Sequence, residues 1–256
     1  MKIVLIGAGN VATHLGIAFK NIGCQIVQVY SRTQASAESL AATLGSEAVS
    51  DIKQLSQNAD LYVIAVSDSA VSEIAANIHL PGKTVVHTAG SLPMNILSEV
   101  SDNYGVIYIP QTFVKNIPIS YKDLQFCIET SNKETEKNIH ELLAQISTHI
   151  LHINSRQREA LHLAAVMVSN FTNCLYGIAD DILSKENLSL EVLQPLIIET
   201  AKKPEHGNPK DLQTGPAKRG DENIIQKHLE MLKNDTPAET LYRLFTKIIQ
   251  ENNSAS

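Results

Sequence analysis

The chain has 256 residues, 43% hydrophobic and 19% charged, which is the composition of an ordinary globular protein with room for one large domain or two modest ones. Its formal net charge of −6 at pH 7, without any run of Lys or Arg, argues against a nucleic-acid-binding surface. The three cysteines lie far apart without metal-ligand spacing, and neither a signal-peptide pattern nor an apolar stretch near the roughly 20 residues of a membrane span is present. We therefore expect a cytoplasmic protein with free thiols, no metal, no nucleic-acid partner and no membrane contact.

The first predicted element is a buried strand over residues 3–6, which runs directly into the sequence GAGNVA. Gly7 permits a tight turn out of the strand, and Gly9 lets a pyrophosphate approach the backbone because it has no Cβ. The small side chain of Ala12 lets the following helix pack closely on the strand. This helix begins near Asn10, so its free N–H groups and positive dipole end would point at the phosphates. The arrangement predicts a dinucleotide-binding site.

The end of the second strand, residues 25–30, indicates which dinucleotide is bound. An NAD-binding protein usually carries Asp or Glu there to accept hydrogen bonds from the ribose 2′-hydroxyl, but the first acid after this strand is Glu38. Ser31, Arg32 and Thr33 offer two hydroxyls and a fixed cation instead, a set suited to the 2′-phosphate of NADP. A solvated loop position is the alternative for Arg32, but the missing acid favours NADP separately.

Strand and helix patterns continue to alternate along the first half of the chain. We expect helices over residues 35–44 and 130–146, and strands over residues 48–49, 61–66, 84–88, 106–109, 125–128 and 150–153. Such alternation predicts an α/β fold with a doubly wound, mostly parallel Rossmann sheet, here over residues 1–153, whose ligands bind at the carboxyl ends of the strands. The residues expected to line the cofactor are Gly7, Gly9, Asn10, Val11, Ser31, Arg32, Thr33, Val66, Ser67, Asp68 and Gly90.

Strand patterns stop at residue 154, and residues 154–256 are predicted to form an all-helical substrate and dimerisation domain. Asn154 with Gln157 forms a possible capping box at the start of one long helix that reaches about residue 184. Its stretch Leu161–Val168 is apolar except for His162, and a helix that is apolar on almost every side must be surrounded. Because too few residues follow to surround it, we expect a homodimer through this domain. Further helices are expected over residues 190–201, 222–233 and 238–251.

Motifs spread over nearly the whole chain carry a resemblance to a known family. They are GAGNVA, the SRT that ends the second strand, HTAGS (87–91), IPQTF (109–113), HLAAVMVSNF (162–171) and TGPAKRGD (214–221). The chain resembles a bacterial group labelled NADP oxidoreductase, whose helical domain is catalogued without a function. The group belongs to the superfamily of pyrroline-5-carboxylate reductase, β-hydroxyacid dehydrogenase and ketopantoate reductase. The resemblance implies the two-domain fold and NADP, but no particular substrate.

The long helix departs from the better-known members of this superfamily. Ketopantoate reductases and β-hydroxyacid dehydrogenases carry a Lys there, which donates a proton as hydride arrives, and an Asn one turn later. This chain has His162 and Val166 at those places, and Asn170 and Asn173 follow. An imidazolium can make the same proton donation because its pKa lies near neutrality. We predict His162 as the general acid, with Ser169 and Asn173 near the same helix face because they follow it by about two and three turns; a hydrogen-bonded core histidine is the alternative.

Two further motifs supply candidate site residues. HTAGS ends a strand where the nicotinamide should lie, so Gly90 and Ser91 are expected to line cofactor or substrate, while His87 lies inside the strand and can simply pack there. In TGPAKRGD, Arg219 suits a substrate carboxylate, with a structural ion pair as the alternative, and Asp221 is a candidate helix N-cap. The catalytic candidates are His162, Ser91, Asn170, Asn173 and Arg219.

The sequence thus predicts an NADP(H)-dependent oxidoreductase that transfers hydride to the C=O of a small carboxylate, like ketopantoate reductase. A keto acid is favoured because its product passes through an alkoxide, which gains more from a general acid than an already charged iminium does. An imine reductase of the pyrroline-5-carboxylate type is the first alternative. A non-catalytic NADP-binding sensor or partner protein is the second, and another cofactor, such as a deazaflavin, is a lesser one.

Overall fold

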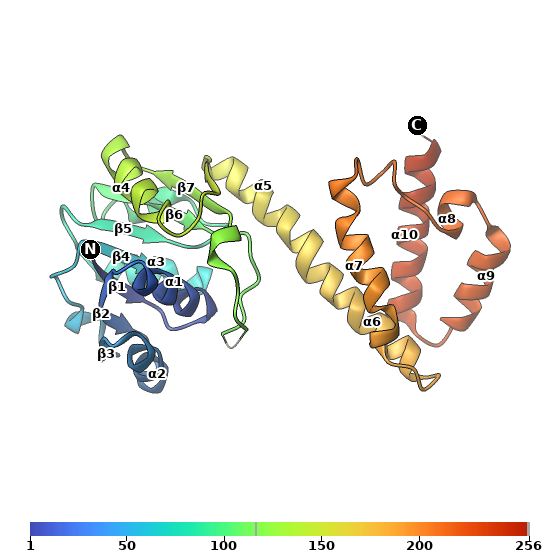
Figure 1. Cartoon of the computed structure of the whole chain (residues 1–256), viewed down its shortest axis with the longest axis horizontal. Coiled ribbons are helices and arrows are strands. Elements are labelled where there is room, and N and C mark those ends of the chain that lie inside the picture. Colours follow the sequence, from blue (N-terminus) through green and yellow to red (C-terminus); the bar gives the residue numbers. More distant parts are fainter. Residues whose placement is uncertain (116, 255–256) are drawn as a thin grey trace. The chain divides into compact units, whose positions relative to one another are not determined.

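The computed structural model describes residues 1–115 and 117–254, and the chain divides into two compact units, Met1–Asn170 and Phe171–Ser256 (Figure 1). Each unit has its own set of secondary-structure elements.

The first unit is built on one eight-stranded sheet. Its strands are β1 (Lys2–Ile6), β2 (Gln25–Tyr30), β3 (Glu47–Val49), β4 (Leu61–Ile64), β5 (Thr84–His87), β6 (Asn103–Tyr108), β7 (Phe126–Thr130) and β8 (Ile150–His152). Their order is β3-β2-β1-β4-β5-β6-β7-β8, and every neighbouring pair is parallel except β6–β7. The predicted doubly wound, mostly parallel sheet is therefore confirmed, with β8 at an edge. The sequence pattern did not indicate the antiparallel direction of β7.

Helices cover both faces of this sheet. They are α1 (Asn10–Asn21), α2 (Gln34–Leu44), α3 (Asp68–Asn77) and α4 (Lys133–Leu143), with short 3₁₀ turns at Ile52–Gln54, Met94–Leu97 and Tyr121–Asp123. The predicted helix over 130–146 is shorter at both ends. It begins at Lys133 because Asn132 caps α4 by accepting a hydrogen bond from the N–H of Thr135 at 2.9 Å. The strands run as continuous apolar segments because both of their faces are buried.

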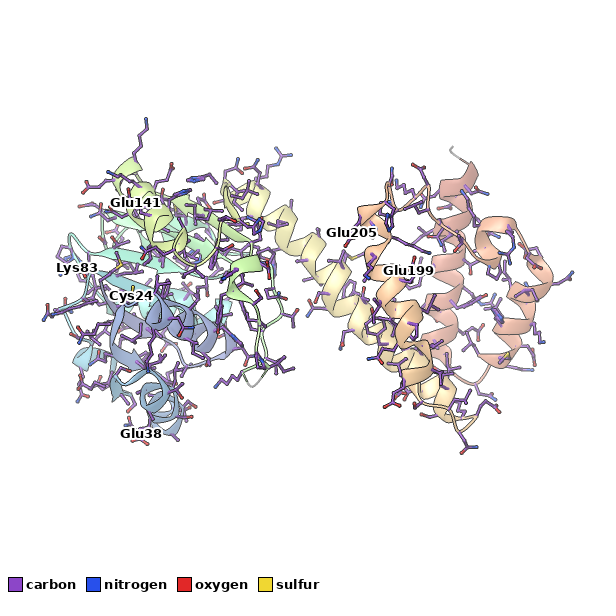
Figure 2. All side chains as sticks on the ribbon, in the orientation of Figure 1. Cys24, Glu38, Lys83, Glu141, Glu199 and Glu205 are labelled. Carbon is purple, nitrogen blue, oxygen red and sulfur yellow. The ribbon has the colours of Figure 1, made fainter. Side chains whose placement is uncertain are left out.

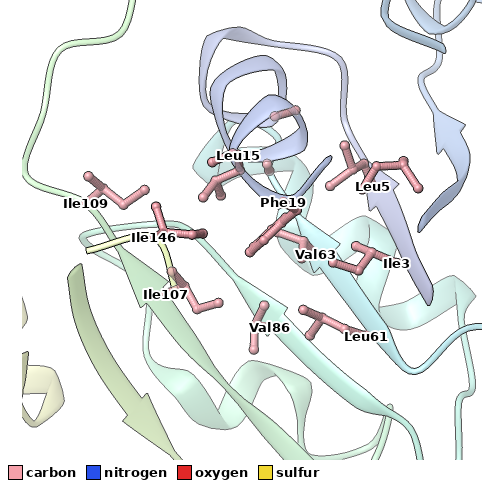
Figure 3. Close-up of a cluster of buried hydrophobic side chains, with 14 of the residues drawn as sticks. Ile3, Leu5, Leu15, Phe19, Leu61, Val63, Val86, Ile107, Ile109 and Ile146 are labelled. Carbon is pink, nitrogen blue, oxygen red and sulfur yellow. The ribbon is translucent and has the colours of Figure 1, made fainter. Parts of the chain in front are cut away.

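Two hydrophobic clusters fill the space between helices and sheet. On one face, Leu15 and Phe19 of α1 pack against Ile3, Val63 and their neighbours (Figure 3). On the other face, Val71 and Ile74 of α3 pack in the cluster that contains Val4 and Ile6 of β1. Adjacent residues of β1 thus point into opposite cores, as the period of two in a strand requires. This packing holds the carboxyl ends of β1, β2, β4 and β5 rigidly along one edge.

The long helical run after the sheet is interrupted. It consists of α5 (Ser155–Ala165), a π-helical segment (Val166–Phe171) and α6 (Thr172–Ser184). The predicted capping box is confirmed: the Asn154 side chain accepts from the N–H of Gln157, and the Gln157 side chain accepts from the N–H of Asn154. The long helix expected to reach about residue 184 is confirmed as one helical run, Ser155–Ser184. Its middle is a π-helical segment, which holds more residues per turn than a regular α-helix and is frequent at functional sites.

The second unit consists of helices. After α6 these are a 3₁₀ turn (Leu190–Leu193), α7 (Gln194–Lys202), a 3₁₀ turn (Lys203–Glu205), α8 (Pro216–Arg219), α9 (Glu222–Met231) and α10 (Thr236–Ser254). Asp221 caps α9 as predicted, because its side chain accepts from the N–H of Ile224 at 3.4 Å. Lys185 and Asp235 form an ion pair at 3.3 Å that links the end of α6 to the start of α10.

The apolar stretch that includes His162 is exposed in the single chain. Leu163 is 65% exposed and Val168 is 74% exposed. Within the described residues, Ser155–Ser184 is also the one helical run that is long and apolar enough to cross a membrane by length and composition. The core helices of soluble proteins meet the same measure, so a single run of this kind is weak evidence for a membrane.

Candidate active site

The site begins at the glycine turn between β1 and α1. Gly7 has a φ of +126°, and a Cβ there would overlap the carbonyl oxygen of Ala65, so only glycine fits. A Cβ on Gly9 would project into open space, where a bound group can approach the backbone. Gly9 is also the N-cap of α1 and provides no side-chain hydrogen bond, so the first N–H groups of the helix are left for a ligand.

A cavity of about 440 Å³ lies over this turn. Its lining comes from the carboxyl ends of β1, β2 and β4 and from α3, which is where a parallel sheet binds its ligands. The predicted cofactor residues that line it are Gly7, Gly9, Asn10, Val11, Ser31, Arg32, Thr33, Val66 and Ser67.

The loop after β2 brings the predicted cation to the cavity. Arg32 lies between Ser31 and Thr33, and the loop is turned by a hydrogen bond from the N–H of Thr33 to Oγ of Ser31 at 3.3 Å. Glu38 is not in the lining: its side chain accepts from Nε2 of Gln34 at 2.8 Å and projects from the outer face of α2 (Figure 2). The ribose-binding acid of NAD-specific sites is thus missing at this loop. The lining does contain one carboxylate that sequence reasoning missed, Glu73 of α3.

A second cavity of about 290 Å³ adjoins the first and shares Val11, Val66 and Thr88 with it. Asp68 and Gly90, the two predicted cofactor residues that do not line the first cavity, line this one. The other lining residues that the first cavity does not share are Ala89, Tyr108, Ile109, Pro110, Gln111, Thr112, His162, Ala165, Val166, Val168, Ser169 and Asn170. All of them belong to the first unit. No Lys or Arg occurs in this lining.

His162 lies in the second cavity wall on α5. Its Nδ1 is 3.3 Å from the hydroxyl oxygen of Tyr108, and the two rings meet edge to face with their centroids 5.8 Å apart. Burial raises the pKa of Tyr108, which keeps the phenol protonated. A neutral imidazole that accepts this phenol proton at Nδ1 carries its own proton at Nε2. Gly90 makes the close packing possible, since a Cβ there would lie 2.6 Å from Nδ1 of His162.

Other polar groups around the second cavity are paired with one another. The hydroxyl of Ser91 donates to the carboxylate of Asp68, at the start of α3. The hydroxyls of Thr112 and Ser169 are 2.7 Å apart. Asn170 joins Ser169 in the lining because the π-helical segment places consecutive residues of the helix at the cavity.

Arg158 is the residue that sequence reasoning missed most clearly. Its side chain is fully buried and pairs with Glu129 on β7 at 3.1 Å. Nη1 of the same guanidinium donates to the carbonyl oxygens of Ala89 and Gly90, at 3.0 and 2.9 Å. The available signal was its spacing, because a residue four positions before His162 lies on the same helix face. The partners on β7 and in the loop after β5 could not be inferred from that spacing.

His87, at the end of β5, is buried and does not line either cavity. Its Nδ1 accepts a hydrogen bond from the N–H of Ala89 at 3.2 Å. Burial, together with the nearby charge of Arg158, lowers the pKa of His87 to about 4. The packing role that the sequence allowed for this histidine is therefore the one observed.

The remaining catalytic candidates lie in the second unit. Asn173 is in α6 and Arg219 is the last residue of α8. Their part in the site stays a prediction. No group of three or more His, Cys, Asp or Glu side chains that could hold a metal ion occurs in the described part of the chain.

The glycine turn, the uncapped helix start and the cationic loop after β2 define a dinucleotide-binding protein of the Rossmann class, with a second cavity that adjoins the first. Comparisons with known proteins agree. Residues 1–110 match a Rossmann-like domain and residues 124–249 match a domain of unknown function, DUF2520. A search of curated proteins found no match.

Among solved structures, the chain is similar to one described as a putative NADP oxidoreductase from Bacteroides fragilis, with 43% identity over 98% of both chains and a TM-score of 0.92. The chain therefore belongs to the family of this NADP oxidoreductase, as its motifs predicted. It is also similar in fold to a reductive aminase from Aspergillus terreus (16% identity, 98% and 92% coverage, TM-score 0.76). A third similar structure is 1-pyrroline-5-carboxylate reductase from Streptococcus pyogenes (12% identity, 98% of both chains, TM-score 0.67). At these identities the last two show the fold alone.

Proposed function

We propose that this protein is an NADPH-dependent reductase of a small carboxylate that carries a C=O bond. The observation that carries the proposal is the pair of adjoining cavities at one edge of the sheet. The lining of the first cavity contains the glycine turn and Arg32, which suit a phosphorylated dinucleotide. The second cavity adjoins the first, and His162 is in its lining.

The residues present fit NADP. The N–H groups at the start of α1 would hold the pyrophosphate, and Gly9 leaves room for it. Arg32, with the hydroxyls of Ser31 and Thr33, would hold the 2′-phosphate through charge-assisted hydrogen bonds. When bound, the nicotinamide supplies or accepts a hydride, and the protein must supply the proton.

His162 is the proposed proton donor. A carbonyl that accepts a hydride becomes an alkoxide, and a positioned imidazolium can protonate it. The phenol of Tyr108 fixes the ring by its contact at Nδ1, which leaves Nε2 as the atom able to donate toward a ligand. A histidine serving only to pack would not need a cavity in front of it, and His162 is a lining residue.

Reduction of an imine, as in pyrroline-5-carboxylate reductase, is the second candidate. The fold likeness to a reductive aminase and to that reductase fits it, but a keto acid makes better use of a proton donor. The substrate carboxylate must be recognised without a cation from the second cavity wall described above. We keep Arg219 as the proposed carboxylate ligand from the helical region.

A screen of NADPH oxidation at 340 nm against 2-oxo acids and cyclic imines tests the proposal. Turnover of a 2-oxo acid that falls strongly in His162→Gln supports it, and turnover of imines alone selects the second candidate. Tight NADPH binding without turnover of any compound would instead indicate the non-catalytic NADP-binding sensor or partner protein.

We also propose a homodimer in which a second copy covers the apolar face of the long helix. Leu163, Met167, Val168 and Phe171 are all more than half exposed in the single chain, a run of large apolar side chains that costs free energy in water. Light scattering at micromolar concentration should give about twice the chain mass of 28.0 kDa. A monomer at that concentration would exclude this assembly.

The expected environment and partners complete the proposal. We propose a cytoplasmic location, a reducing compartment in which the thiols of Cys24, Cys127 and Cys174 would stay free. The proposed ligands are NADP and a small carboxylate, with no metal, nucleic acid or membrane.

A further inference from the structure

The peptide groups that follow β5 are held from one side by a buried cation. The carbonyl oxygens of Ala89 and Gly90 both accept from Nη1 of Arg158. The guanidinium cannot turn away, because Nη2 and Nε bond Glu129 at 3.1 and 3.4 Å, and Nη2 also contacts Oγ of Ser155 at 3.4 Å. Ser155 in turn donates to the other carboxylate oxygen of Glu129 at 2.7 Å.

This anchoring fixes the direction of two N–H groups. In a trans peptide the C=O and the following N–H point in opposite directions, and no cis peptide occurs among the described residues. The N–H of Gly90 therefore points away from Arg158, and so does the N–H of Ser91. Neither of these N–H groups meets an acceptor in the part of the chain that the structure describes.

One of the two free donors lies at the second cavity, and the other follows it directly in the chain: Gly90 is a lining residue, whereas Ser91 lines neither cavity. Gly90 lines the second cavity and follows Thr88, which both cavities share, by two residues. A Cβ on Gly90 would lie 2.6 Å from His162 and 2.9 Å from Tyr108, so these side chains leave no room for the loop to move toward them. Since the lining of this cavity contains no Lys or Arg, backbone N–H groups are among the donors that it can offer to a ligand oxygen besides His162.

We propose that the N–H groups of Gly90 and Ser91 form a binding site for a carboxamide or carboxylate oxygen, and that Arg158 is the positioning residue that aims them. Such an oxygen is present in the nicotinamide carboxamide and in a small carboxylate substrate, so the inference rests on the proposed function and extends it. The bonds from Arg158 to the two carbonyls also polarise the same peptide groups, which strengthens their N–H groups as donors.

The sequence allows both amides to be observed without mutation. Ala-Gly occurs only at 8–9 and 89–90, and Gly-Ser only at 45–46 and 90–91. Protein labelled with carbonyl-¹³C alanine and ¹⁵N glycine therefore gives two filtered amide signals, from Gly9 and Gly90. The corresponding Gly and Ser labelling gives Ser46 and Ser91, of which Ser46 lines neither cavity and serves as the control.

Three titrations of the full chain separate the possible occupants. With 2′,5′-ADP, which lacks nicotinamide, Gly9 should shift while Gly90 and Ser91 stay in place. With NADP⁺, a downfield shift of Gly90 and Ser91 assigns the pair to the carboxamide. A shift that requires NADP⁺ together with pyruvate assigns it to the substrate carboxylate. If Gly9 shifts but Gly90 and Ser91 move under neither condition, the inference is overturned, whereas an unmoved Gly9 contradicts the proposed function itself.

Arg158→Lys tests the positioning role. It should weaken NADP⁺ or pyruvate binding about tenfold while the affinity for 2′,5′-ADP stays within twofold, and it should move the Gly90 amide signal without any ligand. Arg156→Lys, an exposed arginine on the same helix turn, is the matched control and should change nothing. If Arg158→Lys weakens the binding of NADP⁺ and of 2′,5′-ADP equally, Arg158 has only a structural role and does not position the two N–H groups. If the variant does not fold, the titrations of the native chain decide alone.

Discussion

His87 should make the first unit sensitive to acid, and the size of the effect follows from its surroundings. The side chain is fully buried, its Nδ1 already accepts the N–H of Ala89, and its Nε2 has no partner among the described residues. Burial penalises the charged form of this imidazole, and protonation would also put a second positive charge near Arg158. This is why the pKa of His87 is lowered to about 4.

The sign of the effect is fixed by linkage. An unfolded chain binds a proton at histidine with a pKa of about 6.5, so the unfolded state takes up protons between pH 6.5 and 4 while folded His87 does not. Stability is therefore complete above pH 6.5, falls as the pH drops, and levels off below pH 4. The loss from this one group is about 2 kcal/mol at pH 5 and about 3 kcal/mol at pH 4. Against a typical total stability of roughly 5–15 kcal/mol, that is a large share.

The contribution of His87 to the free energy of unfolding can be measured by urea unfolding. The native chain and His87→Gln are compared at pH 7, 6, 5 and 4, at constant ionic strength. The glutamine side chain can still accept the N–H of Ala89 but does not titrate. Between pH 7 and pH 5 the native chain should lose about 2 kcal/mol more than the variant. Parallel curves would refute the reasoning, because they would mean that folded His87 takes up its proton as readily as the unfolded chain does.

Three other changes test the site and the assembly. Arg32→Ala should weaken NADP by ~1.5–3 kcal/mol, the range for a charge-assisted hydrogen bond, and leave NAD nearly unchanged in a fluorescence titration; equal loss for both cofactors would contradict the 2′-phosphate role. His162→Gln should keep the fold and NADPH affinity but lower kcat by about 10²–10⁴-fold; full turnover would make His162 a packing residue. Val168→Glu, at a position 74% exposed in the single chain, should yield a monomer by light scattering, and a dimer of unchanged mass would place the interface elsewhere.

The sequence determined the parts of this protein that depend on local pattern. The strands and the polar or glycine-rich turns that end them could be recognised from the sequence, because strands buried on both faces consist of continuous apolar residues. The turn at Gly7 and the cation at Arg32 could be assigned from the sequence alone, since their roles follow from backbone freedom and charge. Their meeting in one cavity also followed, because parallel strands place their carboxyl ends at the same edge. Motifs over the rest of the chain indicated the family.

The tertiary structure alone decided what depends on contacts between distant segments. The sequence places Arg158 four residues before His162 but does not show its burial: Arg158 is buried against Glu129 and the loop after β5, whereas Arg156 is exposed. The π-helical segment likewise changes which residues of the long helix face the cavity, and a regular period of 3.6 could not reveal it. A buried charge such as that of Arg158 needs partners from several secondary-structure elements, and a local sequence pattern does not show which distant residues those are.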